Sequence, residues 1–127
     1  MTAPITIPLT QKAAVLEAYN TEYIIKTDYP VKQPSDLAAG ECLVKLEYSG
    51  VCHSDLHIRN ADWTKKSKLP IIGGHEGLGR VVAIGENSET TVKVGDRVGV
   101  KWIGNVCGQC VVIYPTTDIC SQSFFQL

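Results

Sequence analysis

Two short segments of this sequence concentrate the side chains that could bind a metal ion. They read Gly50-Val-Cys-His-Ser-Asp-Leu-His57 and Gly73-Gly-His-Glu-Gly77, and together they contain all three histidines of the chain. Cys52 and His75 would supply a thiolate and an imidazole, the donor types that Zn²⁺ prefers. Because the two donors stand on separate segments, only the fold can bring them together. The pattern is typical of a catalytic zinc site.

Other polar residues in these segments could move protons or orient a metal ligand. Residues 52–59 contain few β-branched residues and are expected to form a short helix. Ser54 and His57 would then be neighbours on one helix face. A hydroxyl beside an imidazole can pass a proton from a buried, metal-activated oxygen to solvent. The carboxylates of Asp55 and Glu76 each follow a candidate site residue closely and could orient a ligating imidazole.

Each of these residues also has an ordinary structural explanation. A lone buried cysteine is more often a small hydrophobic residue than a metal ligand. A lone histidine in a loop usually does no more than form hydrogen bonds. It is the occurrence of all these residues together, in this order, that favours a metal site over a set of unrelated packing residues.

Short apolar runs separated by Gly, Pro and Asp predict a mainly β fold around these residues. The expected strands cover residues 12–18, 23–26, 41–49, 78–84 and 98–102. Alternating polarity in residues 41–49 predicts a half-buried strand, with Cys42, Val44, Leu46 and Tyr48 on one face. The strands and the short helix are expected to form a small, mostly antiparallel, barrel-like domain. No Gly-x-Gly-x-x-Gly follows a strand and opens a helix, so no dinucleotide-binding fold is expected.

Composition indicates one compact domain and excludes several classes of partner. Twelve basic residues against 13 acidic ones argue against binding to a nucleic-acid backbone. No apolar run is long enough to span a membrane, and no secretory signal is recognisable. The expected location is the cytoplasm. The Cys107-Gly-Gln-Cys110 pair, among five cysteines, indicates metal or redox chemistry before a disulfide scaffold.

Three blocks of the sequence resemble the zinc-dependent medium-chain alcohol dehydrogenases, and most closely the fungal ones. The blocks are Gly50-Val-Cys-His-Ser-Asp-Leu-His57, Leu69-Pro-Ile-Ile-Gly-Gly-His-Glu-Gly77 and Val94-Gly-Asp-Arg-Val-Gly-Val-Lys-Trp102. A Gly-His-Glu-Gly block at this spacing after Cys-His-Ser-Asp is highly specific. The resemblance covers about residues 10–110. It implies the first part of that family's GroES-like catalytic domain, a partly open β-barrel with a short helix.

The resemblance implies a catalytic zinc and a nicotinamide cofactor. Cys52 and His75 would be zinc ligands, with Glu76 beside the metal. Asp55 would be the carboxylate that acts on the ligating histidine. The implied reaction is oxidation of a primary alcohol to an aldehyde with NAD. The implied partners are a small alcohol or aldehyde and, in full-length members of the family, further copies of the chain.

The same resemblance implies roles for residues that do not bind the metal. Ser54 and His57 correspond to the family's proton relay, and His53 corresponds to a contact with the cofactor pyrophosphate. Trp63 and Trp102 match aromatic residues that narrow the alcohol pocket. On composition alone, each tryptophan is more simply a packing residue.

The chain departs from the family after residue 110. The family carries a structural zinc on four cysteines spaced C-x-x-C-x-x-C-x₇-C, and a structural zinc site needs all four ligands. Cys107 and Cys110 match, but Ile113 and Ser121 stand where the other two thiolates belong, and Cys120 is one residue out of place. We therefore expect only a remnant of that site. Residues 1–110 are interpreted as a partial catalytic domain, and residues 111–127 as a divergent tail.

A second departure bears on activity. In the family, the third catalytic zinc ligand and the nicotinamide-binding domain lie beyond the matching segment, so this chain is expected to be a truncated form that is inactive alone. The alternative is a non-catalytic GroES-like module that binds zinc or a partner subunit. A co-chaperonin of the GroES type is a poorer interpretation, because it leaves Cys52, His57 and His75 without a purpose.

Overall fold

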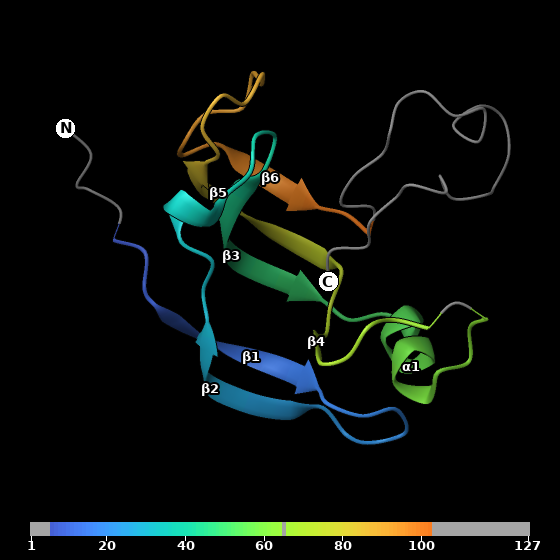
Figure 1. Cartoon of the computed structure of the whole chain (residues 1–127). Helices are drawn as coiled ribbons and strands as arrows, with labels where there is room; N and C mark the ends of the chain where they lie inside the picture. The colour runs from blue at the N-terminus through green and yellow to red at the C-terminus, as the bar shows by residue number, and fades with distance from the viewer. Residues whose placement is uncertain (1–5, 65, 103–127) are drawn as a thin grey trace, which may run out of the picture.

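The computed structural model describes residues 6–64 and 66–102, and within these ranges the structure is mostly β-strand (Figure 1). The elements are β1 (Thr10–Leu16), β2 (Ile24–Pro30), a 3₁₀ turn (Pro34–Asp36), β3 (Cys42–Gly50), α1 (His53–Asn60), β4 (Ile71–Ile72), β5 (Glu76–Ile84) and β6 (Arg97–Val100). The predicted fold class, mainly β with one short helix, is confirmed.

The strands form two separate three-stranded sheets, in the orders β2-β1-β4 and β3-β5-β6. Every strand pair is antiparallel. In the described part of the chain no strand ladder joins one sheet to the other, so the sheets do not close into a barrel. The helix α1 lies on the side toward which β1 and β3 run (Figure 1).

Strand boundaries differ from the predicted ones at positions that have physical explanations. β2 continues to Pro30, which pairs with Thr10 of β1. Proline is tolerated there because it ends a strand at the edge of its sheet, where a missing N–H removes little of the ladder. β4 was not predicted, because two residues are too few to show a periodic pattern.

The strand predicted over residues 41–49 is observed as β3, but the prediction that it is half-buried is wrong for most of its length. Leu46 and Tyr48 are 53% and 70% exposed, and Cys42 is also exposed. The register with β5 shifts between Leu43 and Val44 and again between Leu46 and Tyr48. Such irregularities break the strict alternation of faces. The polarity pattern reflects the pleat of the strand, but it does not determine which face another layer covers.

The buried apolar core comes mainly from the central strand of each sheet. Leu16, Val15 and Val81 have the largest fully buried side chains, two from β1 and one from β5. A central strand has a neighbour on both edges, so its side chains are the ones most easily removed from water. α1 adds Ile58, which is also buried.

The connection between β1 and β2 holds α1 in place. The Asn20 N–H donates to the Arg59 carbonyl oxygen at 2.7 Å. The Arg59 guanidinium lies 3.1 Å from a carboxylate oxygen of Glu22. Sheet β2-β1-β4 therefore contacts the helix that follows β3, which brings the segments around Cys52 and His75 to the same end of the molecule.

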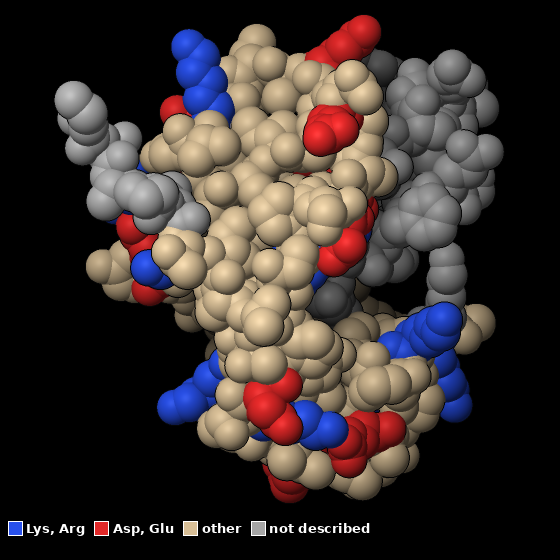
Figure 2. All heavy atoms as spheres, turned by 60° about the vertical axis from the view of Figure 1, so that its left-hand side comes forward, with Lys and Arg blue, Asp and Glu red and all other residues tan. Residues whose placement is uncertain are grey.

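Charged side chains do not form a continuous field on the face drawn in Figure 2. Lysine and arginine alternate there with aspartate and glutamate in small separate groups. This mixed distribution agrees, for that face, with the near balance of charge in the sequence. No helix in residues 6–64 and 66–102 is long and apolar enough to cross a membrane.

Candidate metal centre

Cys52 occupies the N-cap position of α1. Its backbone is extended, and its Sγ accepts a hydrogen bond from the Ser54 N–H at 3.3 Å. Asp55 Oδ2 in turn accepts from the Cys52 N–H at 2.9 Å. The Asp55 N–H also donates to the Cys52 side chain, so Cys52 and Asp55 form a capping box, which satisfies N–H groups that the first helical turn leaves unpaired. Local sequence thus orients the Cys52 thiol.

His75 reaches the same place from the segment that connects β4 of one sheet to β5 of the other. The Gly73 N–H donates to the Ala14 carbonyl oxygen of β1 at 2.9 Å, which ties the end of β4 to its neighbour. Gly74 then adopts a φ of +99°, a conformation that favours glycine because it has no Cβ. This turn directs His75 into the interior, and Glu76 begins β5.

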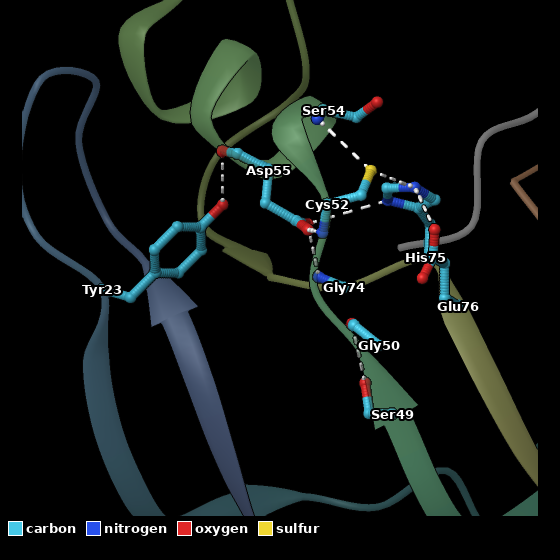
Figure 3. Close-up of polar contacts among 9 residues, drawn as sticks. All are labelled: Tyr23, Ser49, Gly50, Cys52, Ser54, Asp55, Gly74, His75 and Glu76. Atoms are coloured by element: carbon cyan, nitrogen blue, oxygen red, sulfur yellow. Dashed lines mark hydrogen bonds and ion pairs between the residues drawn. The ribbon is translucent and has the colours of Figure 1, made fainter.

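Cys52, His75 and Glu76 converge at this point (Figure 3). Their potential ligand atoms lie within 4.8 Å of one another, and no other group of three or more such donors occurs among the described residues. Cys52 Sγ is 3.2 Å from His75 Nε2, and His75 Nε2 is 3.9 Å from Glu76 Oε1.

The donor set fits a zinc ion. At the usual zinc bond lengths and a tetrahedral angle, sulfur and nitrogen ligands would be separated by about 3.6 Å. The observed separation between Cys52 Sγ and His75 Nε2 is 3.2 Å, so a small adjustment would admit the ion. The Glu76 side chain is 53% exposed, so its carboxylate faces solvent more than the other two donors do.

Asp55 joins the two ligand-bearing segments. It is only 6% exposed, and its two carboxylate oxygens accept from different segments. Oδ2 accepts from the Cys52 N–H, and Oδ1 accepts from the Gly74 N–H at 3.1 Å (Figure 3). Hydrogen bonds to an ionised carboxylate are stronger than neutral ones. Asp55 therefore determines how closely the Cys52 and His75 segments approach each other.

His75 retains one buried polar atom without a partner. Its Nδ1 makes no hydrogen bond to any described residue, although Asp55 Oδ1 lies 3.7 Å away. A metal-ligating histidine normally donates its other ring N–H to a carboxylate or carbonyl oxygen. The position of Asp55 Oδ1 near Nδ1 is compatible with a histidine that binds a metal ion through Nε2.

An open cavity of about 490 Å³ lies beside these donors. His75, Glu76 and Trp102 line it together with apolar residues of the sheet, including Leu78 and Val100, and with the polar residues Ser49 and Lys101. The ring of Trp102 contacts the ring of His75, with centroids 4.5 Å apart. The cavity thus joins a potential metal site to an apolar surface.

Residues 38–123, more than half of the chain, match the family model described as the alcohol dehydrogenase GroES-like domain. The chain belongs to this family. The resemblance predicted from the three sequence blocks is thereby confirmed.

Known relatives of this GroES-like domain are alcohol dehydrogenases. That of Schizosaccharomyces pombe is 46% identical over 106 residues, which are 83% of this chain and 29% of the relative. That of Geobacillus stearothermophilus is 48% identical over 99 residues, which are 78% and 28% of the two chains. The crystal structure of CAD from Helicobacter pylori, complexed with NADP(H), superposes with a TM-score of 0.71 at 26% identity, covering 90% of this chain and 31% of that one. This chain therefore spans less than a third of the length of each of these relatives.

The predicted relay residues of this GroES-like domain lie on α1 but are not hydrogen-bonded to each other. Ser54 and His57 are one turn apart, and His57 Nδ1 instead lies 3.1 Å from Asp62 Oδ2. That contact leaves His57 Nε2 available on the other side of the ring. His53 is exposed, and its ring contacts that of His57 with centroids 4.7 Å apart.

The two predicted pocket tryptophans form a continuous row of rings with the histidines. Trp63 lies 5.6 Å from His57 and 5.3 Å from Trp102, measured between ring centroids. Only Trp102 lines the cavity beside the metal donors, whereas Trp63 lines a smaller hollow next to α1. The structure thus places Trp102 at the candidate site, whereas Trp63 lies outside the cavity of that site.

The predicted remnant of a structural zinc site lies outside the described residues. This applies to Cys107, Cys110 and Cys120, to the departures at Ile113 and Ser121, and to the tail of residues 111–127. The boundary at residue 110 stays a prediction.

Tyr23 is a residue near the site that sequence reasoning missed. Its hydroxyl donates to the Asp55 carbonyl oxygen at 3.2 Å (Figure 3). Burial raises the pKa of this phenol, the charge of Asp55 raises it further, and Arg59 acts in the opposite direction. The phenol therefore keeps its proton near neutral pH and remains a donor. No sequence signal links Tyr23 to Asp55, because their contact depends on how the first sheet packs against α1.

Proposed function

We propose that this chain is the metal-binding part of an alcohol dehydrogenase that oxidises primary alcohols to aldehydes with NAD. The observation that carries the proposal is the convergence of Cys52, His75 and Glu76 from separate elements, within 4.8 Å, beside a cavity. The membership of the GroES-like domain family and the names of the relatives support it.

Cys52 and His75 would hold the zinc ion, with Glu76 beside it. When bound, the ion supplies Lewis-acid chemistry that makes an alcohol hydroxyl easier to deprotonate. Asp55 orients the ligands through its bonds to the Cys52 and Gly74 N–H groups. The apolar wall of the cavity would hold the carbon chain of a small alcohol, and Trp102 would limit its width.

Ser54 and His57 would carry the released proton to solvent. Both side chains project from α1, and His57 is partly exposed, so its Nε2 can exchange a proton with water. The contact between His57 Nδ1 and Asp62 would hold the ring in one orientation. His53, exposed at the start of α1, would contact the cofactor pyrophosphate.

We expect relay variants to change proton movement without releasing the metal. The test joins residues 1–110, up to the predicted boundary, to all of the Schizosaccharomyces pombe relative that lies C-terminal to the matching segment. In this chimera Ser54→Ala and His57→Ala should lower turnover with ethanol by about 10²-fold and alter its pH profile. Zinc content, measured in parallel, should stay at the wild-type value. An unchanged rate and pH profile in both variants would exclude the relay role.

We expect the polypeptide of residues 1–127 to show no alcohol dehydrogenase activity by itself. Hydride transfer requires the alcohol and the nicotinamide ring to be held a few ångströms apart, and no Gly-x-Gly-x-x-Gly in this sequence offers a site for the dinucleotide. The measurement is NADH formation from ethanol by purified, mass-verified protein with and without zinc, using the chimera as the positive control. Zinc-dependent NADH formation by the 127-residue chain would contradict this expectation.

A second candidate function is binding to a partner subunit. Exposed apolar side chains on the β3-β5-β6 sheet favour it, including Leu46, Tyr48 and Val100, which are 53%, 70% and 38% exposed. Zinc binding without turnover in the chimera as well as in the chain would support this candidate over the enzymatic one.

A further inference from the structure

Tyr23 contacts both segments that carry the proposed metal ligands. It stands at the end of the β1–β2 connection, immediately before β2. Its hydroxyl donates to the carbonyl oxygen of Asp55, in the first turn of α1, at 3.2 Å (Figure 3). Its ring lies against Gly73, which precedes His75 by two residues. One side chain therefore spans the gap between the Cys52 segment and the His75 segment.

The contact with Gly73 leaves no room for a Cβ unless the Tyr23 ring shifts. A Cβ added there would lie 2.6 Å from Tyr23 Cε1 and 3.1 Å from Cζ, and the three nearest atoms all belong to the tyrosine ring. Gly73 does not have a positive φ. An alanine at this position is therefore opposed by the ring of Tyr23 and not by the backbone conformation.

The position of Asp55 affects the positions of both proposed ligands, Cys52 and His75. Its carboxylate accepts from the Cys52 N–H at 2.9 Å and from the Gly74 N–H at 3.1 Å. A shift of the first helical turn would therefore move the Cys52 thiol relative to His75. Tyr23 holds that turn, because its hydroxyl donates to the backbone carbonyl oxygen of Asp55. The side chain of the same Asp55 accepts the two bonds from Cys52 and Gly74.

We propose that Tyr23 is a positioning residue of the metal centre, which sets the separation between the Cys52 and His75 ligands by bracing α1 against Gly73. The inference rests on the proposed zinc-binding function. It assigns Tyr23 no contact with metal or substrate. Its effect passes through Asp55 on one side and through Gly73 and Gly74 on the other.

Cobalt binding to the 127-residue chain tests the proposal, because the thiolate-to-cobalt absorption reports ligand geometry. The reference signal is the part of the Co²⁺ spectrum that Cys52→Ser removes, which separates this site from the other cysteines. Tyr23→Phe keeps the ring and removes the hydroxyl, and should weaken Co²⁺ binding about three- to tenfold and shift this band. Tyr23→Leu, which also removes the ring, should have the larger effect of the two.

Gly73→Ala provides a second variant that leaves Tyr23 chemically intact. Its new methyl group should push the ring away from Asp55, so the band should shift as it does in Tyr23→Phe. In the Tyr23→Leu background, the same change should weaken Co²⁺ binding by less than about twofold further, because contacting residues are energetically coupled. Additive effects of the two changes would contradict the proposed bracing contact.

Two tyrosines serve as matched controls for the loss of a hydroxyl. Tyr19 donates to the Ser67 carbonyl oxygen and contacts neither ligand segment through a hydrogen bond. Tyr29 lies in β2, away from α1. Tyr19→Phe is expected to lower the thermal unfolding midpoint without moving the cobalt band, and Tyr29→Phe to change neither.

The outcomes separate this inference from the function on which it rests. A wild-type chain without any Cys52-dependent cobalt band would overturn both. A normal band in the wild type, together with an unshifted band and affinity within twofold of wild type in Tyr23→Phe and Gly73→Ala, would overturn the role of Tyr23 alone. A lowered unfolding midpoint with an unshifted band would likewise reduce Tyr23 to a purely structural contact.

Discussion

Cys52→Ala and His75→Ala are each expected to remove one equivalent of zinc from the chain. The two side chains supply donor atoms that lie close together, with Sγ and Nε2 3.2 Å apart. His75 is also buried, so no other side chain can easily take its place. Because a weakly coordinated ion exchanges with water, either loss should lower the affinity by at least about a hundredfold.

The measurement is zinc content per chain after dialysis against a weak chelator. Cys42→Ala is the matched control, since Cys42 is an exposed thiol in β3 outside the cluster, and it should leave the zinc content unchanged. Glu76→Ala should cause a smaller loss, because the Glu76 carboxylate is half exposed. Unchanged zinc content in both Cys52→Ala and His75→Ala would exclude the metal centre.

Asp55→Ala is expected to have the largest effect on stability. The Cys52 and Gly74 N–H groups each donate to the buried Asp55 carboxylate, and the substitution leaves both without this acceptor. Each lost bond to a buried carboxylate costs about 1–3 kcal/mol, so the free energy of unfolding should fall by about 2–5 kcal/mol. Zinc affinity should fall about 10- to 100-fold at the same time, because the two ligand segments lose their link.

Urea unfolding of the metal-free chain and zinc competition with a chelator measure the two effects. Asp62→Ala is the control, because Asp62 is a half-exposed carboxylate whose hydrogen bond is to His57. It should change the free energy of unfolding by less than about 0.5 kcal/mol. Asp55→Asn should be intermediate, since an amide keeps one acceptor oxygen. If Asp55→Ala proved as stable as Asp62→Ala, Asp55 would not be the link between the segments.

Local sequence was sufficient to predict the features that depend on neighbouring residues. The helix expected over residues 52–59 is observed at His53–Asn60, because its capping box is formed by residues three positions apart. The antiparallel pairing of β1 and β2 was also predictable, since a short connection joins them. The types and order of Cys52, His75 and Glu76 were enough to predict both the kind of donor set and the family.

Other features required the tertiary structure. The exposure of Leu46 and Tyr48 in β3 depends on which layers cover the sheet, and alternating polarity carries no information about that. The bond from Gly74 to Asp55 and the contact of Tyr23 with α1 join residues 19 and 32 positions apart.

The physical reason for this division is the range of the interactions. Donor chemistry and helix capping are properties of a few adjacent residues, so the sequence by itself determined which side chains could bind zinc. The distance between Cys52 Sγ and His75 Nε2 depends instead on contacts between segments that are far apart in the sequence, such as the bond from the Gly74 N–H to Asp55. Only the tertiary structure could therefore decide that these donors meet, and that Asp55 and Tyr23 hold them together.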